Sequence, residues 1–169
     1  MSLELFHAIL FYAFAAAAVA AALVMVSQRN PTYSAFALIV TLVSLAGVFG
    51  LLGSTFIAVL QIVVYAGAIM VLFLFVLMLL NVRAEDRPAG GGRVFMLVAI
   101  ALGAVLAGEV GSVLVAARTP LARPFDASAR AVAHLLFEAQ YLYVFEATSI
   151  LILASLVGAI ALAKRDPGP

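Results

Sequence analysis

The sequence contains no cysteine and no tryptophan. Without cysteine, the chain forms no disulfide and offers no thiolate to a metal ion or an iron–sulfur cluster. Without tryptophan, an aromatic belt at a membrane surface has to come from tyrosine and phenylalanine. Charge is also scarce, because 10% of the residues are charged and the formal net charge is +1. Such a balance gives no electrostatic indication of nucleic acid or an acidic substrate as a partner.

Apolar residues make up 67% of the 169-residue sequence. A soluble domain typically holds about 45–50% apolar residues. The excess does not fit into the core of one small domain and needs lipid as its solvent. Because every backbone polar group must be satisfied within lipid, helices are the natural spanning elements. The composition therefore predicts an all-α integral membrane protein.

Five apolar segments have the length of a membrane-spanning helix, which needs about 20 residues. We expect spans at about residues 5–26, 33–52, 56–80, 94–117 and 141–163. Between the last two spans, an amphipathic stretch beginning near Ala127 predicts a short helix at the membrane interface. The sequence shows neither an internal repeat nor a soluble domain, so residues 1–169 are expected to form a single transmembrane domain.

Lysine and arginine in short loops predict the orientation of the spans. Six positive residues fall on one predicted side of the membrane, and three fall on the other. The larger group is Arg29, Arg83, Arg87, Arg93, Lys164 and Arg165, and the smaller group is Arg118, Arg123 and Arg130. The bias predicts a cytoplasmic C-terminus and, with five spans, a periplasmic N-terminus.

The first span differs from a signal peptide in two respects. Residues 1–5 carry no positive charge, and the apolar run at 5–26 is longer than the hydrophobic region of about 7–15 residues in a signal peptide. We interpret this segment as a retained span. The alanines at 15–18 leave a cleavage site open as an alternative.

Residues suited to covalent or redox chemistry are missing. The glycines at 90–92 lack the lysine and the strand–helix context of a phosphate-binding loop. His7 and His134 lie at or beyond the ends of predicted spans and are not spaced as a haem or metal pair. We therefore expect no catalytic residue, no metal site and no bound cofactor in this chain.

Two carboxylates lie within predicted spans, Glu109 in the fourth and Glu146 in the fifth. An acid at the centre of a spanning helix costs about 2.5–3.5 kcal/mol, so such residues usually face a bundle or water. Tyr143 and Ser149 lie three positions on either side of Glu146 and form a polar stripe with it. One interpretation places both acids on a proton or water path. The alternative is a solvated or paired carboxylate near the interface.

Small residues recur every four positions in the last two spans. They are Gly103, Ala107 and Gly111 in the fourth span, and Ala154 and Gly158 in the fifth. Such faces let helices approach closely. We interpret them as packing surfaces, either within the chain or against another subunit.

The third span is overlong and carries no charge. Its roughly 25 residues reach about 37 Å, against a hydrocarbon core of about 30 Å, so the helix must tilt, bend or include an irregular turn. Its polar side chains, Gln61 and Tyr65, lie one turn apart just before Gly67. A π-bulge at Gly67 and plain close packing at that glycine are both compatible with the pattern.

Residues 64–76, which read VYAGAIMVLFLFV, resemble the signature of subunit J of the bacterial proton-pumping NADH–quinone oxidoreductase, respiratory complex I. The mitochondrial counterpart of that subunit is NADH dehydrogenase subunit 6. The likeness extends to the start of the second span at Asn30 and Pro31, to its end at residues 44–49, and to the last span with Glu146.

The resemblance implies a membrane-arm subunit without a redox centre, next to subunits A, H and K and a neighbouring antiporter-like subunit, in the bacterial inner (plasma) membrane. It implies that the third helix switches between an α-helix and a π-bulge at Val64, Tyr65, Ala66, Gly67 and Ala68, and that this switch opens a water path to the pumping subunits. NADH, FMN, iron–sulfur clusters and a quinone would be bound by other subunits.

Three residues are assigned to that path with different support. Glu146 matches an acid in some family members, whereas Gln61 replaces a glutamate that others carry and so loses the carboxylate. Glu109 matches no family motif, and its assignment rests on membrane depth.

Two other functions remain open from the sequence. The first is a small subunit of a related multisubunit cation/proton antiporter or membrane-bound hydrogenase. The second is a self-contained homo-oligomeric channel or exporter, although the broken helix pair and the paired central charges of a transport site are missing. The sequence also leaves open which quinone is used and whether the input is NADH.

Overall fold

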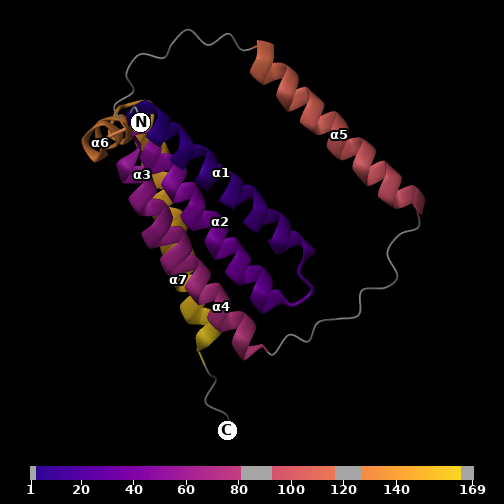
Figure 1. Ribbon diagram of the computed structural model, residues 1–169. Helices are drawn as coiled ribbons and strands as arrows, with labels where there is room; N and C mark the ends of the chain where they lie inside the picture. Colours follow the sequence, from indigo (N-terminus) through magenta and orange to yellow (C-terminus); the bar gives the residue numbers. More distant parts are fainter. Residues whose placement is uncertain (1–2, 81–92, 117–126, 165–169) are drawn as a thin grey trace.

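The computed structural model describes residues 3–80, 93–116 and 127–164, which are helical with short connections and contain no strand. The elements are α1 (Leu3–Ser27), α2 (Pro31–Leu51), α3 (Thr55–Leu60), η1 (Gln61–Ile69), α4 (Met70–Leu79), α5 (Arg93–Ala116), α6 (Ala129–Leu136) and α7 (Leu142–Ala163). Figure 1 shows them in order along the chain. Arginines 83, 87, 118 and 123, Arg165 and the glycines at 90–92 lie outside the described residues.

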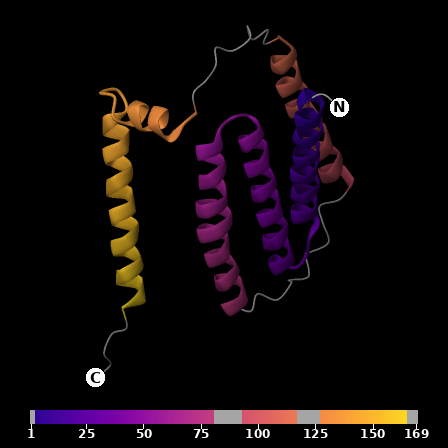
Figure 2. The same cartoon turned by 60° about the vertical axis from the view of Figure 1, so that its left-hand side comes forward.

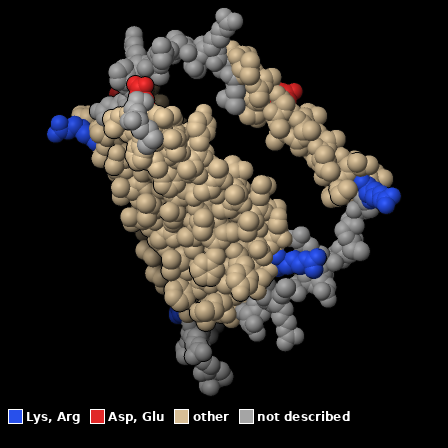
Figure 3. Space-filling model, viewed as in Figure 1, with Lys and Arg blue, Asp and Glu red and all other residues tan. Residues whose placement is uncertain are grey.

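Five helices in the described residues are long and apolar enough to cross a membrane: Leu3–Ser27, Pro31–Leu51, Thr55–Leu79, Arg93–Val113 and Leu142–Ala163. They confirm the predicted all-α fold and the five predicted spans, and the ends of the full helices, with α5 extending to Ala116, lie within two residues of the expected ones. Figure 3 shows a body of uncharged residues with the charged side chains mainly toward its ends. The orientation of the termini remains a prediction.

The turn between α1 and α2 is stabilised by side chains at its two ends. Asn30 is the N-cap of α2, and its side-chain oxygen accepts a hydrogen bond from the Thr32 N–H at 2.9 Å. Pro31 follows at the first helical position, where its missing N–H costs nothing. The Ser34 hydroxyl donates across the turn to the Met25 carbonyl at 2.8 Å and so links the two helices.

Small residues let α1 and α2 pack closely along their length. Ala18 of α1 and Ala35 and Ala46 of α2 are buried. At Gly47, an added Cβ would lie 2.7 Å from the ring of Phe14, so the ring occupies the space where any other residue would place a side chain. The glycine is therefore required for this helix contact.

The turn between α2 and α3 is a Schellman motif. Gly53 has φ +82°, a left-handed conformation that glycine adopts without steric cost. The N–H of Gly53 donates to the Gly50 carbonyl, and the N–H of Ser54 donates to the Phe49 carbonyl. The chain thus reverses in a few residues, and α3, η1 and α4 return along α2, as Figure 2 shows.

The second half of the chain is arranged differently. Figure 1 shows α5 apart from the α1–α4 bundle, and Figure 2 shows α7 apart from it. In the described residues, extended packing contacts join α2 to α1, α3, η1 and α4, and η1 to α3 and α4, but none of them involves α5 or α7. An added Cβ at Gly103, Gly111 or Gly158 would meet no described atom within 4 Å. The small-residue faces of α5 and α7 therefore do not serve packing between the described helices.

The short helix expected before the last span is present as α6, with Ser128 as its N-cap. It spans Ala129–Leu136, with Phe137 as its C-cap, and Glu138 lies in the turn that follows. The ring of Phe137 packs against Phe145 of α7 with centroids 5.1 Å apart. This contact spans the turn between α6 and α7, where the N–H groups of Tyr141 and Leu142 donate to the Glu138 carbonyl.

Candidate functional site: a π-helix in the third span

The third span, Thr55–Leu79, is continuous but changes its winding in the middle. At its start the hydrogen bonds are those of an α-helix, and the Gln61 N–H donates to the Ile57 carbonyl, four residues earlier. At the far end of η1, the Met70 N–H donates to the Tyr65 carbonyl five residues earlier. The nine residues Gln61–Ile69 are therefore a π-helix between two α-helical segments.

Gly67 lies within this π-helix at a point of close backbone approach. A Cβ added at Gly67 would lie 3.1 Å from the carbonyl oxygen of Ile62, which is five residues earlier. This distance is tighter than an ordinary van der Waals contact, so a side chain at position 67 requires the Ile62 carbonyl to shift by a few tenths of an ångström. The missing side chain of Gly67 therefore leaves this backbone geometry undisturbed.

The π winding also decides which residues face α2. Ala58, Ala66 and Met70 are the buried residues of this span, with 9%, 7% and 5% of their surfaces exposed. In a regular α-helix, which advances by about 100° per residue, these positions would spread over about 120°. A π-helix holds more residues per turn, so each residue advances by less and the three come closer to one face. That face packs on α2.

The remaining predicted site residues lie on the other faces of the π-helix. Val64, Tyr65 and Ala68 are exposed, and Gln61 and Gly67 are half-buried. The Tyr65 ring keeps 51% of its surface exposed, and its hydroxyl has no hydrogen-bond partner among the described residues. The structure thus brings Gln61 and residues 64–68 together and presents Tyr65 away from the bundle, toward lipid, water or a neighbouring chain.

The two predicted membrane acids lie elsewhere. Glu146 is exposed in the second turn of α7, and Glu109 is exposed in the C-terminal half of α5. Near Glu146, the hydroxyls of Thr148 and Ser149 donate to the Phe145 carbonyl, so they do not bind the carboxylate. Neither α5 nor α7 packs on η1 among the described residues. A path joining these acids to the π-helix is therefore not formed by the described part of this chain.

The sequence indicated the position of the irregular turn but not its extent. Gly67 and the excess length of the span left a π-bulge and plain close packing both open, and the structure has a π-helix that extends over nine residues. Residues 61–63 also belong to η1, but their side chains are as compatible with an α-helix as with a π-helix, so no sequence signal marked them. No group of three histidine, aspartate or glutamate side chains is placed for metal binding in the described residues.

Five apolar helices of spanning length, one of them containing a π-helix, define a multi-pass helical membrane protein. Comparison with known families makes the assignment more specific. The chain belongs to the family described as NADH-ubiquinone/plastoquinone oxidoreductase chain 6, whose sequence pattern matches residues 21–162.

Named relatives are similar over nearly the whole chain. NADH-quinone oxidoreductase subunit J of Rhodobacter capsulatus is 35% identical over 164 residues, which cover 92% of this chain and 80% of that protein. Subunit J of Pseudomonas aeruginosa is 38% identical and covers 92% of this chain and 96% of its own length. NAD(P)H-quinone oxidoreductase chain 6 of Leptolyngbya boryana is 36% identical over 160 residues. These findings confirm the family that the motif at residues 64–76 indicated.

Proposed function

We propose that this chain is a membrane-arm subunit of a proton-translocating NADH–quinone oxidoreductase, and that its π-helix η1 couples quinone reduction to proton translocation. The observation that carries the coupling role is the π-helix itself. It falls on the tyrosine–glycine motif, in the span that packs on α2, the middle helix of the α1–α4 bundle. π-Helices are rare and occur frequently at functional sites.

A switch requires two packings that differ by only a few kcal/mol. Gly67 favours the π form of η1 in two ways and so brings its free energy closer to that of the α-helical form. Glycine avoids the Cβ contact with Ile62 that would oppose the π form. Glycine also costs an α-helix about 1 kcal/mol relative to alanine, so it weakens the competing form. Converting η1 into an α-helix changes the number of residues per turn and thereby rotates α4 against α2.

The remaining assignments follow from membership of such a complex. The proposed neighbours are subunits A, H and K and an antiporter-like subunit, together with lipid, and the proposed location is the bacterial inner (plasma) membrane. NADH, FMN, iron–sulfur clusters and the quinone would be bound by other subunits. Glu146, Gln61 and Glu109 would contribute to a water path only together with groups from those neighbours. The family match favours this function over the antiporter, hydrogenase and channel alternatives.

The test is the substitution Gly67→Val in the assembled complex. The added Cβ disfavours the π form, and we expect the number of protons translocated per quinone reduced to fall at least about twofold, which is the effect of a bias of only about 0.4 kcal/mol. The ratio is measured in proteoliposomes. The matched control is Gly103→Val, where an added Cβ meets no described atom within 4 Å. An unchanged ratio in fully assembled Gly67→Val complex would overturn the coupling role.

Glu146→Gln tests the proposed path separately. The substitution keeps the shape of the side chain and removes its titratable proton. If Glu146 relays protons, the substitution should therefore lower the translocation ratio without reducing the amount of assembled complex. Proton uptake and quinone reduction are measured in the same vesicles. If both rates equal those of the unchanged complex, Glu146 is a structural or solvated carboxylate.

A further inference from the structure

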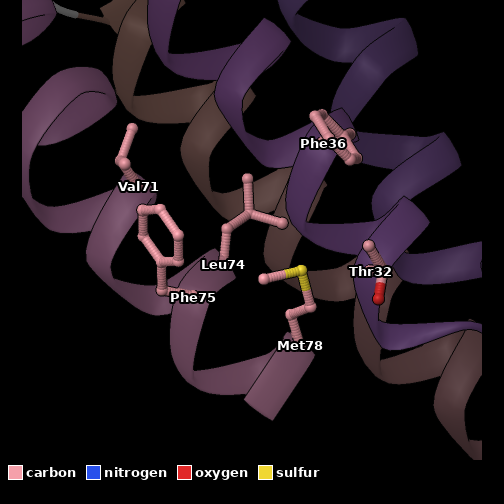
Figure 4. Close-up of a pocket in the computed structure, with 6 residues that line it drawn as sticks. All are labelled: Thr32, Phe36, Val71, Leu74, Phe75 and Met78. Carbon is pink, nitrogen blue, oxygen red and sulfur yellow. The ribbon is translucent and has the colours of Figure 1, made fainter. Parts of the chain in front are cut away.

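An apolar groove runs between the first turns of α2 and the helix α4. It is lined by Thr32 and Phe36 of α2 and by Val71, Leu74, Phe75 and Met78 of α4. Figure 4 shows Leu74 and Met78 extending from α4 toward Phe36 and Thr32. The groove is open on one side, and the lining is apolar except for Thr32. None of the lining residues belongs to η1, the proposed coupling element.

The dimensions of the groove limit what it holds. Its volume is about 290 Å³. From Val71 to Met78 it extends about 10 Å along α4, at 1.5 Å per residue. The mean cross-section is therefore about 28 Å², so the groove is longer than it is wide. A methylene group is close to water in size, so a file of methylenes fits along this length. The groove therefore accommodates a hydrocarbon chain.

The polar end of the groove lies at the end of the bundle. Thr32 stands at the second position of α2, where no helical carbonyl lies four residues earlier. Its hydroxyl has no hydrogen-bond partner among the described residues, whereas Thr41 and Ser44, deeper in α2, donate to carbonyls four residues earlier at 3.0 and 2.8 Å. The Thr32 hydroxyl is thus available to a polar group at the mouth of the groove.

Charge at this end of the molecule favours an anion. Arg29 lies in the turn three positions before Thr32. Figure 3 shows further basic side chains toward this lower end. Arg93 begins α5 and Lys164 follows α7, but these helices make no extended contact with α2 or α4, so Arg29 is the cation assigned to the groove. The described acids Glu4, Glu138 and Glu146 lie near the starts of α1 and α7, at the opposite end, and Glu109 lies in the C-terminal half of α5. The described residues therefore offer a phosphate attraction here without a competing carboxylate.

We propose that this groove binds an anionic phospholipid, with one acyl chain between α2 and α4 and the phosphate near Arg29 and the Thr32 hydroxyl. The chain lies parallel to the helices, so its first methylenes contact Met78 and the later ones contact Phe36 and Val71. Lipid recognition of this kind combines hydrocarbon burial with the attraction of a basic residue at the membrane surface, worth about fivefold in affinity per cation.

The absence of tryptophan from the chain gives a direct test. Phe75→Trp places a single tryptophan in the groove, which can be excited apart from the tyrosines, and Leu72→Trp places one at an exposed position three residues away that does not line the groove. The full chain is reconstituted into phosphatidylcholine vesicles that contain either dibrominated phosphatidylglycerol or dibrominated phosphatidylcholine at equal mole fraction. Bromine quenches tryptophan on contact.

We expect the tryptophan at position 75 to be quenched by brominated phosphatidylglycerol with about fivefold higher relative affinity than by brominated phosphatidylcholine. Adding Arg29→Gln should abolish this preference, and adding Arg93→Gln, which removes a charge at the same end of the chain, should leave it unchanged. The tryptophan at position 72 should show no preference. Circular dichroism confirms that each variant keeps its helical content.

Three results would overturn the proposal. Equal quenching of Phe75→Trp by the two lipids would show an unselective hydrocarbon contact. Quenching by neither lipid would show that protein fills or closes the groove, for instance through side chains of a neighbouring helix. A preference for phosphatidylglycerol that persists after Arg29→Gln would show that the anion is held elsewhere.

Discussion

The two halves of this chain differ in how their apolar surfaces are covered. Helices α1, α2, α3, η1 and α4 pack on one another through alanine and glycine contacts, whereas α5 and α7 have no extended packing contact within the described residues. Small residues occur in both halves, but an added Cβ is resisted at Gly47 and meets open space at Gly103 and Gly158. Composition alone therefore does not tell which helices pack within a chain and which need lipid or neighbouring subunits.

Gly47→Leu should produce the largest difference in stability between a substitution in the packed half of the chain and the matched substitution in the other half. The new side chain would overlap the Phe14 ring, whose atoms lie 2.7–2.8 Å from the added Cβ. Overpacking of this kind typically costs about 1–3 kcal/mol. We expect a lower midpoint of thermal unfolding for the full chain in detergent. Gly103→Leu is the matched control and should leave the midpoint nearly unchanged, so equal effects at the two glycines would contradict the contrast.

Ser34→Ala should have a smaller effect within the packed half. It removes the hydrogen bond of 2.8 Å from the Ser34 hydroxyl to the Met25 carbonyl, which links α1 to α2. Such bonds in membrane proteins are worth about 0.6 kcal/mol on average. Ser155→Ala in α7, whose hydroxyl donates only to carbonyls of its own helix, serves as the control. If Ser155→Ala lowered the stability as much as Ser34→Ala, the bond between α1 and α2 would contribute no more than a bond within one helix.

The sequence predicted the helices more reliably than their packing. Long apolar runs gave all five spans, because this signal depends on local composition. The end of α6 was less predictable, since it depends on the contact between Phe137 and Phe145 across the turn. The separation of α5 and α7 from the bundle left no trace in the sequence, because both are as apolar as the packed helices.

The π-helix was predictable only in part. Gly67 and an overlong span indicated an irregular turn near the middle of the third span. Its extent over Gln61–Ile69 depends on the alignment of Ala58, Ala66 and Met70 toward α2, which is a tertiary requirement. Side chains at residues 61–64 have no feature that distinguishes π from α winding.

The central claim, that α4 must rotate against α2 for coupling, is tested most directly by cross-linking these helices. The chain contains no cysteine, so introduced pairs are its only thiols. Leu38 and Leu77 line one cavity between α2 and α4, and Phe14 and Gly47 meet between α1 and α2. Each pair is replaced by cysteines and joined by a short thiol cross-linker in the assembled complex. The account predicts that cross-linking lowers the protons translocated per quinone reduced for the pair at 38 and 77 and leaves the ratio unchanged for the pair at 14 and 47. An unchanged ratio with the pair at 38 and 77 fully cross-linked would contradict it.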